Sequence, residues 1–467
     1  MLKITDFQNP YKRPMKKDVI IIGAGLTGLT TAYYLKKKGF NITILEKNNR
    51  AGGVIQTLKE GDFIYETGPN TGVVGNPEVA ELFEELSDSC KLIIANPEAK
   101  RRLIWKNNAW HALPSGLLSA IKTPLFSLKD KFRILGEPFR KKGTNPYECI
   151  ADLVVRRLGR SYLDYAVDPF ISGVYAGDPN QLITQFALPK LYQLEQNYGS
   201  FIKGAIKKKK EPSDERSKKA TREVFSAEGG LSNLIHALEA AIGKENIILG
   251  AENITISQDA GNYTTHYSDD HSTVKNIQSK YVITTVGAYA LPKLLPFIGE
   301  KQLSPITNLP YAKVTQVIAG YKNWNGKSVK AFGGLVPYKE KRNVLGILFT
   351  SSCFVNRAPK EGAVLSVFLG GMRRPDMALQ SEDQIKSIVL NEVNNMLQQK
   401  GKPEILRVFK YEHAIPQYEI SSEERFKCIK ELQNTYKGLI LAGNIRDGIG
   451  MADRIKQGRT IAEQIEL

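Results

Sequence analysis

The sequence predicts a mixed α/β fold in which a Rossmann-like domain, assembled from separate stretches of chain, carries an inserted β-sheet domain and a helical domain. Three observations lead to this prediction. An apolar run at residues 19–22 precedes a glycine-rich turn and a helical stretch, and strand-like runs recur at residues 246–257 and 280–286. The chain closes with a strand at residues 438–442, a second glycine-rich turn and a helix. A final strand, turn and helix that return to the first domain indicate a discontinuous nucleotide-binding unit.

The first elements stand in the order that a dinucleotide site requires. Gly23 permits a tight turn, Gly25 lets the backbone approach a pyrophosphate, and Gly28 lets the helix pack close to the strand. The N-terminus of that helix offers N–H groups and partial positive charge. The next strand, residues 41–45, ends in Glu46, whose carboxylate accepts ribose hydroxyls and repels a 2′-phosphate. The pattern therefore predicts FAD or NAD rather than NADP.

Further glycine-rich segments favour FAD. Residues 50–53 and 63–70 have the composition of backbone-rich loops that run along the far end of a long cofactor. A second glycine-rich helix start, at residues 443–451, supplies N–H groups that stabilise the negative charge of a reduced flavin. The candidate cofactor-binding residues are Gly23, Ala24, Gly25, Leu26, Thr27, Gly28, Glu46, Lys47, Arg50, Gly52, Gly53, Gly68, Pro69, Asn70, Gly443, Asn444, Gly450, Met451 and Ala452.

Length and composition limit the remaining possibilities. A chain of 467 residues predicts two or three domains, and 42% hydrophobic with 24% charged residues is typical of a globular protein. No run reaches the ~18 consecutive apolar residues of a membrane-spanning helix, and the first 17 residues lack the apolar core of a signal peptide. The four cysteines lie far apart without metal-binding spacing, which predicts reduced thiols in a cytoplasmic protein and no metal site.

The formal net charge of +17 is the least ordinary bulk property. Its densest part is a run of lysines at residues 207–210, which we expect in a solvated loop, with contact to anionic lipid headgroups as the alternative. No aromatic residues are interleaved with these charges to stack bases, so we expect no nucleic-acid partner.

Residues 113–206 have a helical, amphipathic pattern with prolines as breaks. Two interpretations of its apolar positions are equally supported: a face that lies on a membrane surface, or a face packed on the protein's own core. These positions are Leu117, Leu118, Ile121, Leu125, Phe126 and Leu128.

The remaining pattern completes the domain division. We expect a helix at residues 232–242, strands at 314–321, 344–349 and 363–368, and a helix at 382–399. The predicted FAD-binding domain comprises residues 1–88, 222–290 and 430–467. The predicted substrate-binding domain comprises 89–111 and 291–429, and residues 112–221 form the helical domain, a candidate for membrane association.

Several longer motifs identify a family resemblance. With the two glycine-rich turns and residues 50–53, the chain resembles the FAD-dependent amine oxidase superfamily. Within it, the chain is most similar to the oxygen-dependent protoporphyrinogen oxidases of the HemY type. The motifs that carry this resemblance are residues 168–179 (DPFISGVYAGDP), 345–352 (LGILFTSS), 356–359 (NRAP), 368–371 (FLGG) and 443–450 (GNIRDGIG).

This resemblance implies oxidation of protoporphyrinogen IX to protoporphyrin IX in haem biosynthesis. Molecular oxygen would reoxidise a non-covalently bound FAD and yield hydrogen peroxide. A hydride mechanism of this kind needs no catalytic acid, base or nucleophile from the protein. Leu335, Leu348 and Phe368 resemble the residues that sandwich the macrocycle. Arg102 resembles an arginine that pairs with a propionate, and Gly177 a position where backbone passes close to the substrate.

The chain departs from its relatives at particular positions. Gln56 stands where many members have a basic residue, and Ala176 replaces a frequent glycine. Asn253, which the resemblance adds to the cofactor-binding set, replaces an apolar residue near the adenine. Gln316 stands where amine oxidases of the superfamily place a lysine near the flavin. No cysteine lies in the final glycine-rich turn, so covalent attachment of FAD is not expected.

Alternative functions remain open from the sequence. Coproporphyrinogen III, with four propionates instead of two, would suit the same basic residues. A polyamine oxidase or a carotenoid desaturase shares the superfamily, although Gln316 disfavours the amine oxidase. A non-catalytic binding protein that kept the fold would lack bound flavin. The sequence decides neither the native electron acceptor, nor peripheral contact with an anionic cytoplasmic membrane, nor homodimer formation.

Overall fold

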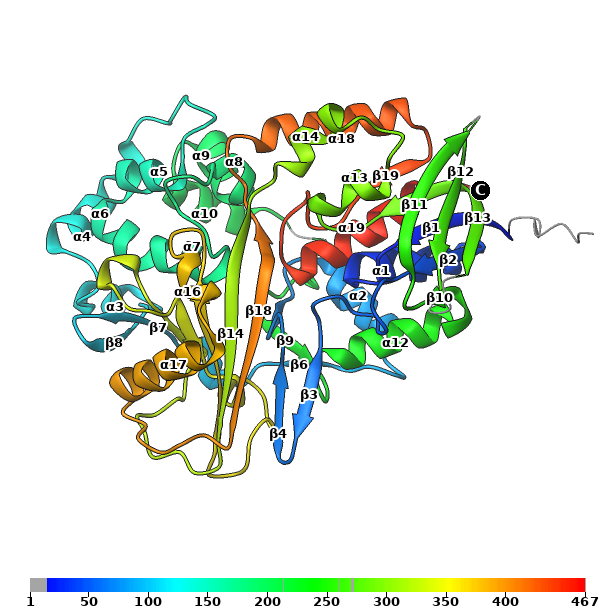
Figure 1. Cartoon of the computed structure of the whole chain (residues 1–467). Helices are drawn as coiled ribbons and strands as arrows, with labels where there is room; N and C mark the ends of the chain where they lie inside the picture. The colour runs from blue at the N-terminus through cyan, green and yellow to red at the C-terminus, as the bar shows by residue number, and fades with distance from the viewer. Residues whose placement is uncertain (1–14, 213, 260, 270–272, 467) are drawn as a thin grey trace, which may run out of the picture.

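The computed structural model describes residues 15–212, 214–259, 261–269 and 273–466. Two expectations, the start of the first domain at residue 1 and the absence of a signal-peptide core, fall largely outside these ranges. Two seven-stranded sheets organise the chain, and a group of helices lies at one end of the second sheet (Figure 1).

The first sheet has a parallel centre. Its order is β10-β2-β1-β13-β12-β11, with β19 also paired to β13, and β10, β2, β1, β13 and β19 run parallel. Parallel strands are buried on both faces, which explains why β1 contains a continuous apolar run. The strands are β1 (Met15–Ile22), β2 (Ile42–Leu45), β10 (Ile247–Ile248), β11 (Glu252–Asp259), β12 (Asn262–Ser268), β13 (Val274–Thr284) and β19 (Leu439–Leu441).

Helices cover both faces of this sheet. One face shares a core with α1 (Leu26–Lys37), α12 (Ser232–Ile242) and α19 (Met451–Gln464). The other face packs against α13 (Leu291–Leu294), α14 (Glu300–Thr307) and α18 (Ser422–Thr435). These last three helices belong to stretches that we expected mostly in the substrate-binding domain, and their packing places them with the first sheet.

The second sheet is mostly antiparallel, in the order β18-β14-β17-β16-β15-β7-β8. Val317, Ile347 and Val367 point to one face, where they are buried against α17 (Glu382–Leu397). The opposite face is turned toward the loops of the first sheet. The strands are β7 (Arg102–Lys106), β8 (Ala109–Ala112), β14 (Tyr311–Tyr321), β15 (Gly333–Leu335), β16 (Gly346–Leu348), β17 (Ala363–Gly370) and β18 (Ile405–Pro416).

Two smaller sheets, β3-β4 and β5-β9-β6, accompany the two large ones. Residues 63–66, expected as part of a loop, form β4 and pair with β3. These strands are β3 (Thr57–Glu60), β4 (Phe63–Glu66), β5 (Gly72–Val73), β6 (Leu92–Ile94) and β9 (Val224–Ala227).

A buried ion network stabilises the helical segment. The Arg157 guanidinium is fully buried and lies 3.1 Å from Glu137 and 2.5 Å from Glu195. Glu137 also accepts hydrogen bonds from Ser200 and Phe201, so it joins the network to the start of α10. The longer helices here are α3 (Leu117–Lys122), α4 (Leu128–Leu135), α5 (Ile150–Arg157), α7 (Asp168–Val174), α9 (Pro189–Tyr198) and α10 (Phe201–Lys210).

The run of lysines is not in a loop, so that expectation is wrong. Residues 207–210 form the last turn of α10, and Ser200 Oγ caps its start by accepting from the Lys203 N–H at 3.1 Å. Lysine is a good helix former, and cations at the C-terminus interact favourably with the helix dipole. The lysines are nevertheless exposed, as expected.

The apolar positions of the helical segment divide between the two interpretations. Leu125 and Phe126 pack in a core with Ile104, whereas Leu118 and Leu128 are more than two-thirds exposed. The side chain of Leu117 lies outside the described part of the structure. Within the described residues, no helix has the length and apolar character needed to cross a bilayer. All four cysteines are free thiols.

Candidate active site

The parallel strands of the first sheet end at one level. Ile22 of β1 is in register with Leu45 of β2 and Thr284 of β13, and Thr284 is in register with Leu441 of β19. The predicted glycine turn, the predicted acidic residue and the predicted C-terminal glycine follow within two residues of these ends. They therefore meet at the carboxyl edge of the sheet, where nucleotides bind in open α/β folds.

The first turn leaves room beside the N-terminus of α1. Gly23 has a φ of +101°, and a Cβ on Gly28 would lie 2.0 Å from the Gly23 carbonyl oxygen, so both positions require glycine. A Cβ on Gly25 would meet no described atom within 4 Å. No described side chain caps α1, so its first N–H groups face this space. The open space at Gly25 is what a pyrophosphate requires.

A buried carboxylate lies beside the turn. Glu46 is 5% exposed, and its Oε2 accepts from the Ala24 N–H at 2.8 Å. Its Oε1 accepts from the N–H and the side-chain amide of Asn48, at 3.0 and 2.7 Å. The Glu46 carbonyl accepts from the Ala251 N–H at 2.9 Å, which brings the start of β11 to the same place. A carboxylate has about four acceptor positions, so Glu46 retains capacity for a ribose hydroxyl.

The loop at residues 50–53 lies directly over the first glycine-rich turn, residues 23–28. The Gly52 N–H donates to the Ala24 carbonyl at 2.8 Å, and a Cβ on Gly53 would lie 3.4 Å from the Gly25 Cα. Arg50 does not extend toward this space. Its guanidinium donates to the carbonyls of residues 51, 53 and 55, so it braces the loop from within.

The final turn brings a second helix N-terminus to the site. Thr27 Oγ1 donates to the Arg454 carbonyl at 3.4 Å, so the first turns of α1 and α19 are in contact. The Asn76 side chain donates to the Ala452 carbonyl at 2.9 Å, so the loop after β5 also contacts the start of α19. Gly443 has a φ of +85°, and its N–H donates to Gln457 at 2.9 Å. Two helix N-termini with partial positive charge thus meet at one site.

Some predicted cofactor residues have side chains directed elsewhere. Leu26 and Met451 are buried in the core of the first sheet, and Lys47 is exposed. Asn253 has a φ of +49°, and its side-chain amide donates to Ser268 on β12 at 3.2 Å. Asn444 and Pro69 are half-buried beside the glycine positions, and the Gly450 N–H donates to Asp453 at 3.0 Å.

The predicted substrate residues lie on one face of the second sheet. Arg102 is paired with Gly333, which is paired with Leu348. Two residues along, Leu335 is paired with Gly346, which is paired with Phe368. Directly paired residues, and residues two apart on a strand, point to the same face. The structure therefore brings Arg102, Leu335, Leu348 and Phe368 together. This face is only partly covered, since all four side chains are partly or largely exposed.

The same face touches the cofactor loops. Gln316 is paired with Phe368, and its amide nitrogen donates to the Glu66 carbonyl at 2.9 Å. Ser366 is paired with Leu348, and its hydroxyl donates to Asn70 Oδ1 at 2.7 Å. The Asn70 amide in turn donates to the Gly68 carbonyl at 3.1 Å. The predicted substrate face and the predicted cofactor loop are thus joined by side-chain hydrogen bonds. Gln316 Oε1 is a buried acceptor with no partner among the described residues.

Gly177 lies at the border of this face. It is buried, and a Cβ there would lie 2.6 Å from Gln417 Oε1. The adjacent Ala176 packs beside Phe368 and has a φ of +47°, which explains why a glycine is frequent at that position. Lys106 turns away from the site, since its ammonium donates to the carbonyls of residues 124 and 125.

Sequence reasoning missed the residues that hold these parts together. Glu66 is 2% exposed and accepts from Arg357 at 3.0 Å, from the Leu231 N–H at 3.1 Å and from Thr57 at 2.6 Å. Burial raises the pKa of Glu66 above its ordinary value, while Arg357 acts to lower it. Arg357 stands inside the NRAP motif, which was the available signal; Ser366 stands in an ordinary strand sequence and gave none.

Comparison with known proteins shows what the chain is similar to. The profile of the family described as "Flavin containing amine oxidoreductase" matches residues 26–466. The chain is 28% identical to protoporphyrinogen oxidase 2 of Arabidopsis thaliana, over 96% of this chain and 94% of that one. It is 25% identical to coproporphyrinogen III oxidase of Bacillus subtilis, over 95% and 97%. A crystal structure from Exiguobacterium sp. 255-15, provisionally named a protoporphyrinogen oxidase, superposes with a TM-score of 0.79 at 23% identity, over 96% and 98%.

Proposed function

This chain belongs to the flavin-containing amine oxidoreductase family, and from that premise we propose that it oxidises protoporphyrinogen IX to protoporphyrin IX, with molecular oxygen as the acceptor and hydrogen peroxide as the second product. As a member of the family it is an oxidoreductase that uses FAD. Relatives named for protoporphyrinogen and coproporphyrinogen oxidation support a porphyrinogen substrate. The observation that carries the proposal is the row of Arg102, Leu335, Leu348 and Phe368 on one sheet face joined to the cofactor loops.

The residues around the first turn suit the cofactor. Gly25 leaves space for the pyrophosphate, Glu46 can accept ribose hydroxyls, and the N-terminus of α19 favours negative charge on the reduced flavin. Bound FAD supplies the two-electron acceptor for the hydride leaving the macrocycle. No cysteine stands in the final turn, so the cofactor is held without a covalent bond.

The chain's own contribution is positioning. Leu335, Leu348 and Phe368 offer an apolar surface for a large macrocycle, and the exposed Arg102 guanidinium offers a bidentate partner for a propionate. Gln316 and Ser366 fix this surface relative to the cofactor loop. Gln316 is a neutral amide, which disfavours an amine oxidase that relies on a lysine at this position.

Porphyrin formation tests the proposal. The purified protein with FAD is mixed in air with protoporphyrinogen IX or coproporphyrinogen III, and porphyrin fluorescence is corrected for spontaneous oxidation. Faster turnover of protoporphyrinogen is the expected result. Preference for coproporphyrinogen would retain the mechanism and change the substrate. A rate no higher than the spontaneous one with both substrates would refute the proposal.

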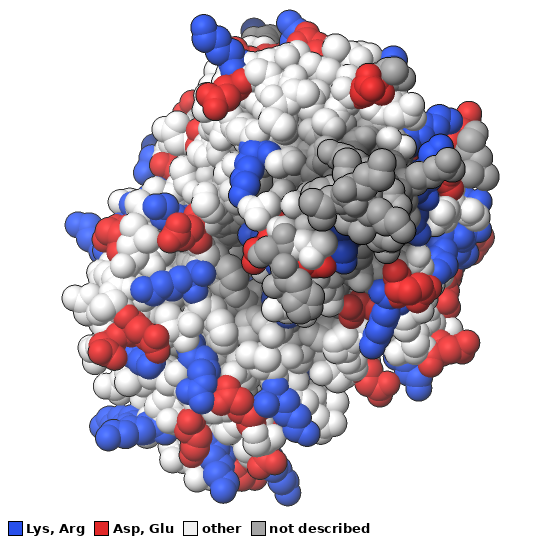
Figure 2. Space-filling view, turned by 45° about the vertical axis from the view of Figure 1, so that its right-hand side comes forward, with Lys and Arg blue, Asp and Glu red and all other residues white. Residues whose placement is uncertain are grey.

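The proposed setting is the cytoplasm, with peripheral contact to an anionic membrane. Lys203 lies 5.4 Å from the ring of the exposed Phe139, so the lysine-bearing helix α10 adjoins the segment that follows α4. Apolar side chains flanked by cations are typical of interfacial binding. On the face shown in Figure 2, by contrast, positive and negative side chains are interspersed. The exposed apolar residues are Leu118, Ile121, Leu128, Phe132, Leu135, Phe139 and Ile206.

Vesicle sedimentation tests this contact. The double variant Phe132→Ser/Phe139→Ser should bind phosphatidylglycerol vesicles at least tenfold more weakly than the unchanged protein. Val274→Ser, an equally exposed apolar position on the first sheet, serves as the control and should bind normally. Equal binding by all three proteins, or equal binding to phosphatidylcholine, would contradict an anionic membrane contact through this surface.

A further inference from the structure

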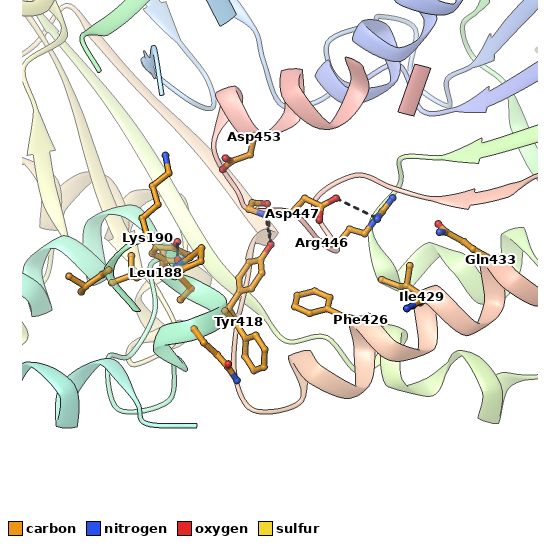
Figure 3. Close-up of a pocket in the computed structure, with 17 residues that line it drawn as sticks. Leu188, Lys190, Tyr418, Phe426, Ile429, Gln433, Arg446, Asp447 and Asp453 are labelled. Carbon is orange, nitrogen blue, oxygen red and sulfur yellow. Dashed lines mark hydrogen bonds and ion pairs between the residues drawn. The ribbon is translucent and has the colours of Figure 1, made fainter. Parts of the chain in front are cut away.

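A cleft of about 720 Å³ lies between the helical segment and α18, beside the turn that leads into α19 (Figure 3). One wall comes from Leu188 and Leu191 and the opposite wall from Ile429, and Phe186 and Phe426 meet at the floor between them. The described residues that line it include none of the five predicted substrate-binding residues. The cleft is therefore a site separate from the face of the second sheet, and its volume is within the usual range for small-molecule sites.

The floor of the cleft is aromatic. Phe186 and Phe426 meet edge to face with ring centroids 5.8 Å apart, and Tyr418 lies 6.2 Å from Phe426. Tyr418 is 2% exposed and Tyr175 is 8% exposed, so both form the base of the cleft rather than its rim. An aromatic floor between apolar walls suits a flat, apolar body better than a flexible chain.

The rim carries unpaired positive charge. Lys190 of α9 and Lys430 of α18 are exposed, and neither ammonium has a hydrogen bond or ion pair to any described residue. The acidic groups of the cleft are already engaged. Asp447 accepts from Gln457 at 2.8 Å and lies 3.5 Å from Arg446, and Asp453 accepts from the Gly450 N–H. A ligand with carboxylates at the edge of its apolar body is complementary to this arrangement.

The third wall is part of the predicted cofactor turn. The Tyr418 hydroxyl donates to the Gly448 carbonyl at 3.2 Å and accepts from the Gly448 N–H at 2.8 Å. The half-buried Arg454 guanidinium donates to the carbonyls of residues 446, 447 and 448, at 2.8, 2.9 and 3.0 Å. These bonds fix the wall at Gly448, three residues before the start of α19. A ligand in the cleft would therefore contact the same turn that faces the flavin.

We propose that this cleft is a second binding site for a carboxylated porphyrin, the product of the proposed reaction. The identity of the ligand rests on the proposed function, whereas the existence of the site rests on the cleft itself. A fatty acid shares the chemistry of an apolar body with a carboxylate. The aromatic floor and the presence of two exposed lysines at the rim favour the flat dicarboxylate over a monocarboxylate with a flexible chain.

A binding titration tests the proposal without relying on turnover. The purified FAD-loaded protein is titrated with protoporphyrin IX, and porphyrin fluorescence, stoichiometry and the flavin absorbance spectrum are recorded. Leu188→Trp fills the cleft, and Lys190→Glu/Lys430→Glu reverses the rim charge. Lys427→Glu is the matched control, since Lys427 is exposed on the same helix and does not line the cleft.

The unchanged protein should bind two porphyrins per chain, and filling of the cleft should add a shift in the flavin spectrum to the one caused by porphyrin at the second-sheet face. Leu188→Trp and the double lysine variant should each weaken porphyrin binding to the cleft at least tenfold and remove the flavin shift that this binding adds. Lys427→Glu should change the affinity of the cleft by less than twofold. Protoporphyrin dimethyl ester should bind the unchanged protein at least fivefold more weakly, and oleate should not displace porphyrin.

Unchanged stoichiometry and affinity in both cleft variants would overturn the site. Displacement of porphyrin by oleate, together with binding of the dimethyl ester as tight as that of protoporphyrin IX, would refute porphyrin as the ligand. Circular dichroism and FAD content establish that each variant is folded. Porphyrin binding in the cleft by a protein that oxidises neither porphyrinogen would refute the proposed function alone.

Discussion

Replacing Arg357 with methionine should destabilise the protein through the carboxylate that it leaves behind. Arg357 is 5% exposed and Glu66 is 2% exposed, and their charged atoms lie 3.0 Å apart. Removing one partner of a buried ion pair typically costs about 3–5 kcal/mol, because the other charge remains out of water. Thr57 and the Leu231 N–H still donate to Glu66, so we expect the lower end, about 3 kcal/mol.

The loss should depend on pH. Burial raises the pKa of Glu66, and Arg357 opposes this rise, so Arg357→Met raises that pKa further. A carboxyl group with a raised pKa holds its proton longer in the folded protein than in the unfolded chain. The stability of the variant should therefore fall as pH increases from the ordinary glutamate value, about 4.5, through the raised folded value. Adding Glu66→Gln removes the charge and should restore about 2 kcal/mol at pH 8.

Urea unfolding of the FAD-loaded protein at pH 5 and pH 8, followed by flavin release and circular dichroism, measures these differences. Arg407→Met is the matched control, because Arg407 pairs with Glu60 in an ion pair whose arginine is half exposed; it should cost less than about 1 kcal/mol. A loss below about 1 kcal/mol in Arg357→Met, or an equal loss at both pH values, would show that the buried charge is not what Arg357 stabilises.

Three further predictions follow from single positions. Gly25→Ala should fold normally but bind FAD at least tenfold more weakly, a loss of about 1.4 kcal/mol, whereas Gly28→Ala should lower the melting temperature of the protein. Calorimetry and flavin content distinguish the two effects. Normal flavin content in Gly25→Ala would contradict a pyrophosphate site at Gly25. Arg102→Ala should raise KM for protoporphyrinogen about tenfold, or about 1.4 kcal/mol, with little change in kcat. The neighbouring Arg101→Ala should leave KM unchanged. If steady-state kinetics give equal KM values for both variants, Arg102 does not belong to the substrate site. Ala176→Gly should stabilise the protein by about 0.5 kcal/mol, because relief of the left-handed backbone exceeds the added entropy of the unfolded chain; a loss of stability on urea unfolding would contradict this.

The cofactor half of the site was predictable because its signals are local. Gly23, Gly25 and Gly28 are contiguous with the strand and helix that they join; Gly23 and Gly28 are required sterically, and Gly25 leaves open space. The side-chain roles within that half were less predictable. Arg50 donates to carbonyls of its own loop, and Asn253 donates to Ser268 on β12, so neither side chain has a direction that its residue type and position in the sequence specify.

The predicted secondary structure was wrong where the local sequence pattern differs from the environment of the segment in the folded protein. The lysine run looked like a solvated loop, but Ser200 and the buried network around Glu137 provide a cap and an anchor for a helix. The strand β18 was missed because one side of it is exposed and polar, so that it lacks the apolar continuity of β1.

The sequence by itself determined the order of strand, glycine turn and helix at both ends of the chain, and the family to which those elements belong. Only the tertiary structure decided that Arg102, Leu335, Leu348 and Phe368 share one face. Pairing register across β7, β15, β16 and β17 sets that face, and a shift of one residue would turn these side chains to the other side. Only the tertiary structure brought Asn70 to Ser366 and α9 to α18, because contacts between distant segments depend on packing that no single segment encodes.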